Sequence, residues 1–200
     1  MAGPDPTLKR AVDECRRCEL WERATQGVPG EGARRPTLML VGEQPGDEED
    51  RQGHPFVGSA GKLLRDLMEQ AGVDPATTYV TNAVKHFYWE PRGKRRIHKT
   101  PAQRHIEACL VWLEQEIAKY RPRVIVALGR TALVAVVGRA MTLTAARTQK
   151  LATEAGVPIV ATYHPSAALR APTPELRAQI RGMLLGDLVK ARELAEKLGT

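Results

Sequence analysis

The chain is poor in aromatic residues and cysteines, and it has no long apolar run. Phe, Trp and Tyr together make up 4% of its 200 residues. A membrane-spanning helix needs roughly 18 or more consecutive apolar residues, and the sequence has no such stretch. The first residues also lack the basic and then apolar pattern of a signal peptide. We therefore expect a cytoplasmic protein that does not bind a membrane.

The three cysteines are Cys15, Cys18 and Cys109. They cannot form a disulfide framework in a cytoplasmic protein. An isolated Cys-x-x-Cys pair is typical of redox, zinc and iron–sulfur sites. A redox motif would need a strand before it and a helix after it, which residues 1–20 do not supply. The pair therefore favours a metal site, which requires further ligands.

The overall composition is that of an ordinary globular protein, with 42% apolar and 26% charged residues. Its length suits a single domain over residues 1–200 with one substantial core. The net charge of +7 and the pI of about 9.6 favour an acidic partner, and nucleic acid is the commonest one.

Residues 85–104 form the most basic segment of the chain. Seven of these residues are Lys or Arg and one is acidic, so the segment contributes +6 of the net +7. Three aromatic residues, 87–89, precede most of the charges. Pro91 and Gly93 exclude a long helix, so we predict an exposed basic loop, centred on residues 85–100. Such a loop can neutralise phosphates and stack on bases, although a solvated loop without a partner is the alternative.

The apolar pattern predicts alternating strands and helices. Short apolar runs indicate buried strands at residues 37–42, 78–84, 123–128 and 158–162. Helical patterns occupy residues 6–24 (broken at the cysteine pair), 63–71, 101–120, 131–137 and 174–198. Residues 27–36 and 43–50 are expected to be loops, and residues 139–156 at most a hairpin or an edge strand. This order predicts a three-layer α/β/α fold around a central, mainly parallel, four-stranded sheet.

Polar residues with possible chemical roles follow three of the predicted strands. Glu43 follows the first strand, Asn82 to His86 end the second, and His164 follows the last. Ligands bind at the carboxyl ends of the strands in such sheets. We therefore expect these residues to share one site.

Four motifs occur in order along the chain: Gly42-Glu-Gln-Pro-Gly46, Thr81-Asn-Ala-Val-Lys-His86, Gly93-Lys-Arg-Arg-Ile-His98 and Tyr163-His-Pro-Ser166. With them, the sequence resembles the uracil-DNA glycosylase superfamily over most of its length. It most resembles the iron–sulfur (family 4-like) branch, and within that branch the UdgX-type proteins. The resemblance implies that a uracil nucleotide is flipped out of DNA into a pocket.

The resemblance also assigns roles to individual residues. Asn82 would read the uracil edge, Phe56 would stack on the base, and His164 would bind the uracil oxygen that becomes negative. Ser166 would belong to a phosphate-gripping turn. The remaining pocket residues implied by the resemblance are Gly42, Gln44, Gly46 and Asp47.

Glu43 and His98 carry the most specific expectation. The family places a carboxylate near the sugar at Glu43, where it can stabilise an oxocarbenium ion or accept a proton. UdgX-type proteins place the loop histidine, here His98, against the sugar C1′ and become covalently attached to DNA. The alternative is a conventional turnover glycosylase that uses water, in which His98 only contacts phosphate.

The expected partner is uracil-containing DNA, preferably single-stranded, bound by a monomer. The basic loop would contact its phosphates through Lys94, Arg95, Arg96 and Lys99. A nucleic-acid-binding module without chemistry is a further alternative.

The same resemblance implies a [4Fe–4S] cluster. Its ligands would be Cys15, Cys18, Cys109 and His86, the last standing where the family has its fourth cysteine. Zinc is chemically compatible with the same residues, and unrelated cysteines are the plainest alternative. The cluster would have a structural rather than a redox role.

Several other polar residues receive no functional role. His54 is expected in a loop and His105 facing solvent, while Glu48 and Glu49 are expected to be solvated. Trp89 is expected to pack or to stack at the surface.

Overall fold

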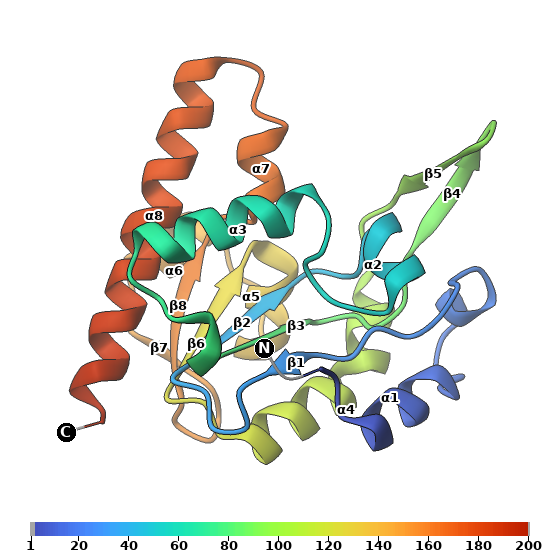
Figure 1. The fold of residues 1–200 in the computed structure, drawn as a ribbon, viewed down its shortest axis with the longest axis horizontal. Coiled ribbons are helices and arrows are strands. Elements are labelled where there is room, and N and C mark those ends of the chain that lie inside the picture. The colour runs from blue at the N-terminus through green and yellow to red at the C-terminus, as the bar shows by residue number, and fades with distance from the viewer. Residues whose placement is uncertain (1–2, 200) are drawn as a thin grey trace.

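The computed structural model describes residues 3–199, so the ends of the predicted 1–200 domain lie outside it. A six-stranded sheet forms its centre, in the order β1-β3-β2-β6-β8-β7 (Figure 1). Its strands are β1 (Glu31–Gly32), β2 (Leu38–Gly42), β3 (Thr78–Asn82), β6 (Val124–Leu128), β7 (Leu151–Ala152) and β8 (Pro158–Thr162). The inner four strands are parallel, whereas β1 and β7 pair antiparallel at the edges.

The mainly parallel sheet is confirmed, but the predicted number of four strands is wrong. The two additional strands have two residues each, which is too short to leave an apolar pattern. β1 lies in the predicted loop 27–36. β7 lies in the unpatterned region 139–156, for which at most a hairpin or an edge strand is expected.

Helices cover both faces of the sheet and confirm the three-layer architecture. One face packs against α3 (Ser59–Gln70), α7 (Pro165–Leu169) and α8 (Pro174–Lys197), and the other against α4 (Gln103–Tyr120), α5 (Arg130–Val137) and α6 (Leu143–Arg147). Because side chains alternate along a strand, Leu38 and Leu40 join the first core while Met39 and Val41 join the second. Between residues 3 and 199, no helix is long and apolar enough to cross a membrane.

The predicted basic loop contains a two-stranded hairpin, β4 (Trp89–Arg92) and β5 (Arg95–His98). It projects from the body of the molecule near α2 (Asp47–Gln52) (Figure 1). Pro91 is tolerated because both strands of the hairpin have a free edge. Gly93 lies at the turn with a φ of 61°, a conformation that favours glycine.

The remaining boundaries follow local capping. The segment 6–24 divides into α1 (Pro6–Asp13) and the 3₁₀ helix η1 (Glu19–Glu22), as the broken pattern predicts, and a second 3₁₀ helix, η2 (Pro75–Thr77), precedes β3. α2 begins within the predicted loop 43–50. α4 begins at Gln103 rather than after Thr100, because the Nδ1 atom of His105 accepts the Ala102 N–H at 3.1 Å and caps the helix there.

Candidate active site

A cavity of about 500 Å³ opens at the carboxyl ends of the parallel strands. Each of the four inner strands contributes to it through the residue at its end or the loop that follows it. His98 reaches the same cavity from the hairpin. The predicted site residues that line the cavity are Glu43, Gln44, Gly46, Asp47, Phe56, Asn82, His98, His164 and Ser166.

Glu43 and His98 face one another in this cavity. The Nε2 atom of His98 lies 3.5 Å from Oε1 of Glu43. The other carboxylate oxygen accepts a hydrogen bond of 2.5 Å from the hydroxyl of Thr131, which fixes its orientation. Burial lowers the pKa of His98 below its usual 6.5, and this effect exceeds the opposing attraction of Glu43. His98 is therefore a neutral imidazole beside a carboxylate at neutral pH.

The hydrogen bonds of His164 define its tautomer. Its Nδ1 atom accepts the backbone N–H of Ser166 at 3.2 Å and lies 2.7 Å from the Ser166 hydroxyl. Because a backbone N–H can only donate, Nδ1 carries no proton in the neutral ring, and Nε2 must carry it. Burial lowers the pKa of His164 to about 4. His164 thus offers a neutral N–H donor at the cavity.

Phe56 is held in an unusual backbone conformation. Its φ is 56°, in the left-handed region that bulky residues rarely adopt. Arg65 donates a 2.8 Å hydrogen bond to the Phe56 carbonyl. A Cβ on Gly61 would meet the same carbonyl oxygen at 1.7 Å, so only glycine fits there. The ring lies 6.2 Å from that of His164, at 27° to it. Sequence reasoning missed both Arg65 and Gly61.

The backbone carbonyl of Asn82 belongs to a buried polar network around Lys85. Lys85 donates to the Asn82 carbonyl at 2.7 Å, to Thr81 at 2.8 Å and to Glu116 at 2.7 Å. The side chains of Lys85 and Glu116 are 0% exposed. On the cavity side, a Cβ on Gly42 would meet the Asn82 Oδ1 atom at 2.4 Å, so Gly42 makes room for the amide.

The side chain of Gln44 connects the first motif to the hairpin. It donates to the carbonyls of Tyr88 at 3.2 Å and Lys99 at 3.1 Å, and it accepts the Tyr88 N–H at 3.1 Å. These are the residues just before β4 and just after β5. Gln44 therefore holds both ends of the hairpin, a role beyond the pocket lining expected for it.

Glu49 is buried, so the expectation that it is solvated is wrong. Its two oxygens accept the N–H groups of Gly46 at 3.0 Å and Gly58 at 2.8 Å. It thereby fastens together the two loops that carry Glu43 and Phe56. Glu48 is exposed, as expected.

Residues 29–184 match the family model of the uracil DNA glycosylase superfamily. The chain belongs to this superfamily. The match includes every predicted site residue outside the cysteine pair, so the cavity lies entirely within the matched region.

Several uracil-DNA glycosylases align with this chain over most of its length and most of their own. A type-4 uracil-DNA glycosylase of Thermotoga maritima is 37% identical, over 96% of this chain and 95% of its own. Those of Pyrobaculum aerophilum and Sulfurisphaera tokodaii are 37% and 35% identical. These alignments cover 90% and 94% of this chain, and 89% and 83% of the relatives.

The cationic residues of the hairpin differ in their surroundings. Lys94 and Arg95 are exposed, and Lys99 lies 3.1 Å from Glu90. Arg96 is instead held by Asp47 and Asp50, with its side chain only 14% exposed. Outside the hairpin, Arg130 and Arg170 also line the cavity. Sequence reasoning missed both, although Arg130 lies two residues after β6 and Arg170 lies four residues after the Tyr163–Ser166 motif.

The four predicted cluster ligands do not form one shell. Cys18 and Cys109 lie together, and the hydrogen bond between them lowers the pKa of Cys18 to about 6 and raises that of Cys109. Cys15 accepts a 3.4 Å hydrogen bond from Trp112. His86 lines a separate cavity beside α1. Across the described part of the chain, no three His, Cys, Asp or Glu side chains are grouped as ligands of one metal ion.

Two further histidines have structural partners. His105 is 0% exposed, so the expectation that it faces solvent is wrong. Its Nε2 atom lies 2.9 Å from Glu19, which also pairs with Arg104 and so joins η1 to α4. His54 lies in a loop, as expected, and pairs with Glu31 at 2.7 Å.

Proposed function

We propose that this protein is a uracil-DNA glycosylase that excises uracil and then becomes covalently linked to the sugar through His98. The observation that carries the proposal is the 3.5 Å separation of His98 Nε2 and Glu43 Oε1 in the cavity. The names of the type-4 relatives support the excision step.

Recognition uses a nucleotide that has left the base stack. Asn82 presents an amide donor and acceptor side by side, which complements the edge of uracil. Phe56 offers a ring face for stacking. The cavity of about 500 Å³ has room for one base and part of its sugar.

Excision breaks the bond between uracil N1 and the sugar C1′. The electron pair leaves with uracil, and negative charge develops on its carbonyl oxygen. The Nε2–H of His164 donates to that oxygen and stabilises the charge. The uracil anion then takes a proton from solvent, and an oxocarbenium ion remains on the sugar.

Trapping follows when one ring nitrogen of His98 bonds to C1′ with its lone pair. The proton on the other ring nitrogen passes to the Glu43 carboxylate. The product is a neutral N-alkyl imidazole, which is a poor leaving group. Hydrolysis therefore stalls, and each molecule acts once.

A denaturing gel after mixing with a uracil-containing oligonucleotide tests the proposal. We expect a slower-migrating protein band that survives boiling, no such band with a thymine oligonucleotide, and none with His98→Ala. A wild-type protein that releases abasic DNA over many cycles without a band would identify a conventional glycosylase. A band that persists in His98→Ala would identify another nucleophile.

Two finer expectations belong to the same proposal. Single strands should be preferred, because extrusion from a duplex costs a few kcal/mol of pairing and stacking. Competition between single- and double-stranded oligonucleotides tests this preference. The [4Fe–4S] cluster remains a prediction of the resemblance on which no step above depends, and analysis of iron and acid-labile sulfide in the purified protein tests it.

A further inference from the structure

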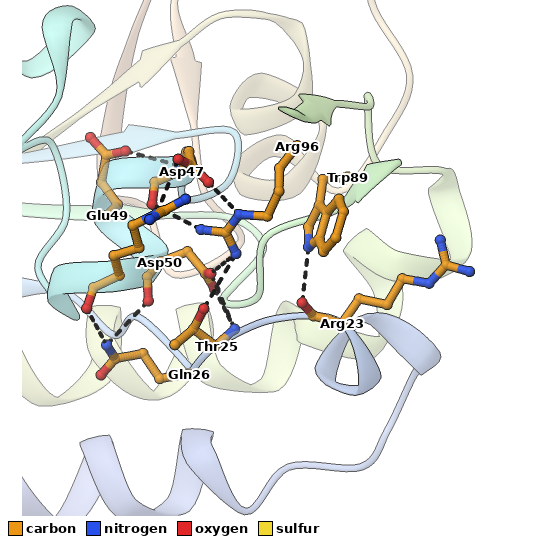
Figure 2. Close-up of polar contacts among 10 residues, drawn as sticks. Arg23, Thr25, Gln26, Asp47, Glu49, Asp50, Trp89 and Arg96 are labelled. Carbon is orange, nitrogen blue, oxygen red and sulfur yellow. Dashed lines mark hydrogen bonds and ion pairs between the residues drawn. The ribbon is translucent and has the colours of Figure 1, made fainter. Parts of the chain in front are cut away.

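Arg96 lies at the junction of three segments that are far apart in the sequence. Its guanidinium binds the Asp47 carboxylate through Nε, Asp50 at 2.6 Å through Nη1, and the Asp47 carbonyl at 3.3 Å through Nη2. Nη1 also lies 3.3 Å from the hydroxyl of Thr25. Figure 2 shows these contacts between β5, α2 and the segment that follows η1.

Of the two carboxylates that receive Arg96, the one of Asp50 is itself fixed. Asp50 is 0% exposed and accepts the backbone N–H of Thr25 at 2.9 Å. Gln26 donates to the carbonyls of Asp50 at 3.1 Å and Arg51 at 3.0 Å. Arg96 therefore binds to a prearranged acceptor, the buried carboxylate of Asp50, whose contacts Figure 2 shows.

Aromatic contacts hold the same part of the hairpin. The Arg96 guanidinium carbon lies 5.4 Å from the ring centres of both Phe87 and Trp89. The Trp89 indole donates a 2.9 Å hydrogen bond to the Arg23 carbonyl (Figure 2). Trp89 is also the direct cross-strand partner of His98.

These contacts bear on His98 because of its position in β5. Arg96 and His98 are two residues apart, so their side chains share one face of the strand. Asp47 lies four residues after Glu43, and it is the first residue of α2, the helix that follows the Glu43 loop. The contacts of Arg96 with Asp47 and Asp50, which we call the clamp, thus tie the strand of His98 to the loop of Glu43.

We infer that Arg96 is a positioning residue that holds His98 against Glu43, and that it is not a phosphate ligand. This inference rests on the proposed function. When the clamp is weakened, His98 approaches C1′ less often, and water reaches the oxocarbenium ion instead. Arg96 therefore sets the partition between covalent trapping and release of abasic DNA.

The partition is measured as the ratio of free abasic product to boiled-gel adduct, with total uracil release as the second readout. In Arg96→Lys, which keeps the charge but loses the fork geometry, we expect this ratio to rise about tenfold or more. Trp89→Phe is a milder change, because it removes the indole hydrogen bond and narrows the ring near Arg96 but keeps an aromatic side chain, so it should raise the ratio less. Arg92→Lys is the matched control on the same hairpin and should leave the ratio at the wild-type value.

Hydrogen exchange of the amides of residues 89–98, without DNA, is an independent readout. It should quicken in Arg96→Lys and Trp89→Phe but not in Arg92→Lys. An unchanged ratio in both test variants would overturn the inference, as would a weaker salt dependence of DNA binding in Arg96→Lys with no change in the ratio. A wild-type protein that forms no adduct at all would overturn the proposed function itself, which is a different result.

Discussion

The two sides of the cavity are built in different ways. Glu43 and His164 follow strands of the parallel sheet and Asn82 ends one, and nearly every side chain of these strands is buried. His98 stands on a hairpin whose residues are mostly exposed. Isolated two-stranded hairpins are only marginally stable, so this one depends on its tethers to Gln44 and α2.

The same difference is seen between two of the ion-pair systems of the molecule. Lys85 and Glu116 form a pair with no solvent exposure directly beneath Asn82. Arg96 forms its pairs at the edge of the cavity, where Asp47 is 41% exposed. The first system ties Asn82, the proposed reader of the base, to the folded core, whereas the second ties the strand of His98, the proposed nucleophile, to the loop of Glu43. Excision and trapping should therefore be separable by mutation.

The largest effect is expected from the sheet side, in Lys85→Met. Removal of the ammonium leaves Glu116 as an uncompensated buried charge, which should lower the free energy of unfolding by about 3–5 kcal/mol. Uracil excision should fall with it, because Asn82 loses the hydrogen bond to its carbonyl. Chemical denaturation and single-turnover uracil release measure the two effects.

The exposed pair of Lys119 and Asp5 provides the control. Lys119→Met should change the free energy of unfolding by at most about 1 kcal/mol, because exposed ion pairs contribute little. A similar loss in both variants would show that the burial of the Lys85 pair has no special importance.

The next largest effect is expected in Glu43→Gln. The amide keeps the shape of the side chain but cannot accept the proton from His98, so the rate of adduct formation should fall by about 10²-fold or more. Thr131→Val, which removes only the 2.5 Å hydrogen bond to Glu43, should slow it less. Time courses on denaturing gels measure both rates, and an unchanged rate in Glu43→Gln would exclude its role as proton acceptor.

The sequence predicted the sheet side of the site well. Buried parallel strands leave continuous apolar runs, and their polar end residues must meet at one edge of the sheet. Glu43, Asn82 and His164 were placed correctly by this reasoning. Thr131 could have been found by the same rule, since it follows the third inner strand closely.

The hairpin side was harder to predict. Arg96 looks like any other cation in a basic run, and its partners lie almost fifty residues earlier in the chain. Nothing local distinguishes it from Arg95, which is exposed. His105 was misplaced for the same reason, because its partner Glu19 belongs to a distant segment. Long-range polar pairing leaves no periodic signal in a sequence.

A smaller effect, specific to the hairpin side, is expected in the pH dependence of trapping. Only the neutral imidazole of His98 has a lone pair for attack, and burial lowers its pKa below 6.5. The rate of adduct formation should therefore be constant above pH 6.5, and it should fall only as the pH drops through the lowered pKa of His98. Arg170→Ala removes a charge that lowers the pKa of His98 and should move the fall to higher pH. Glu43→Gln should move it to lower pH.

Single-turnover rates of adduct formation across this range measure the shift. Uracil release by His98→Ala serves as the control, because its pH profile contains the effect of His164 but not of His98. A fall that occurs at the same pH in Arg170→Ala and in the wild type would contradict this assignment.

The smallest effect is expected at the exposed end of the hairpin, in Lys94→Ala. A side chain that only neutralises a phosphate should weaken reversible binding to thymine DNA, which forms no adduct, and should reduce the steepness of the negative slope of log K against log salt by about one. Because Lys94 has no contact with the clamp, the ratio of abasic product to adduct should stay at the wild-type value. Fluorescence anisotropy over a salt series measures the slope, with Lys190→Ala on α8 as the control. A changed ratio in Lys94→Ala would mean that the hairpin moves as a whole, and that positioning of His98 cannot be assigned to Arg96 alone.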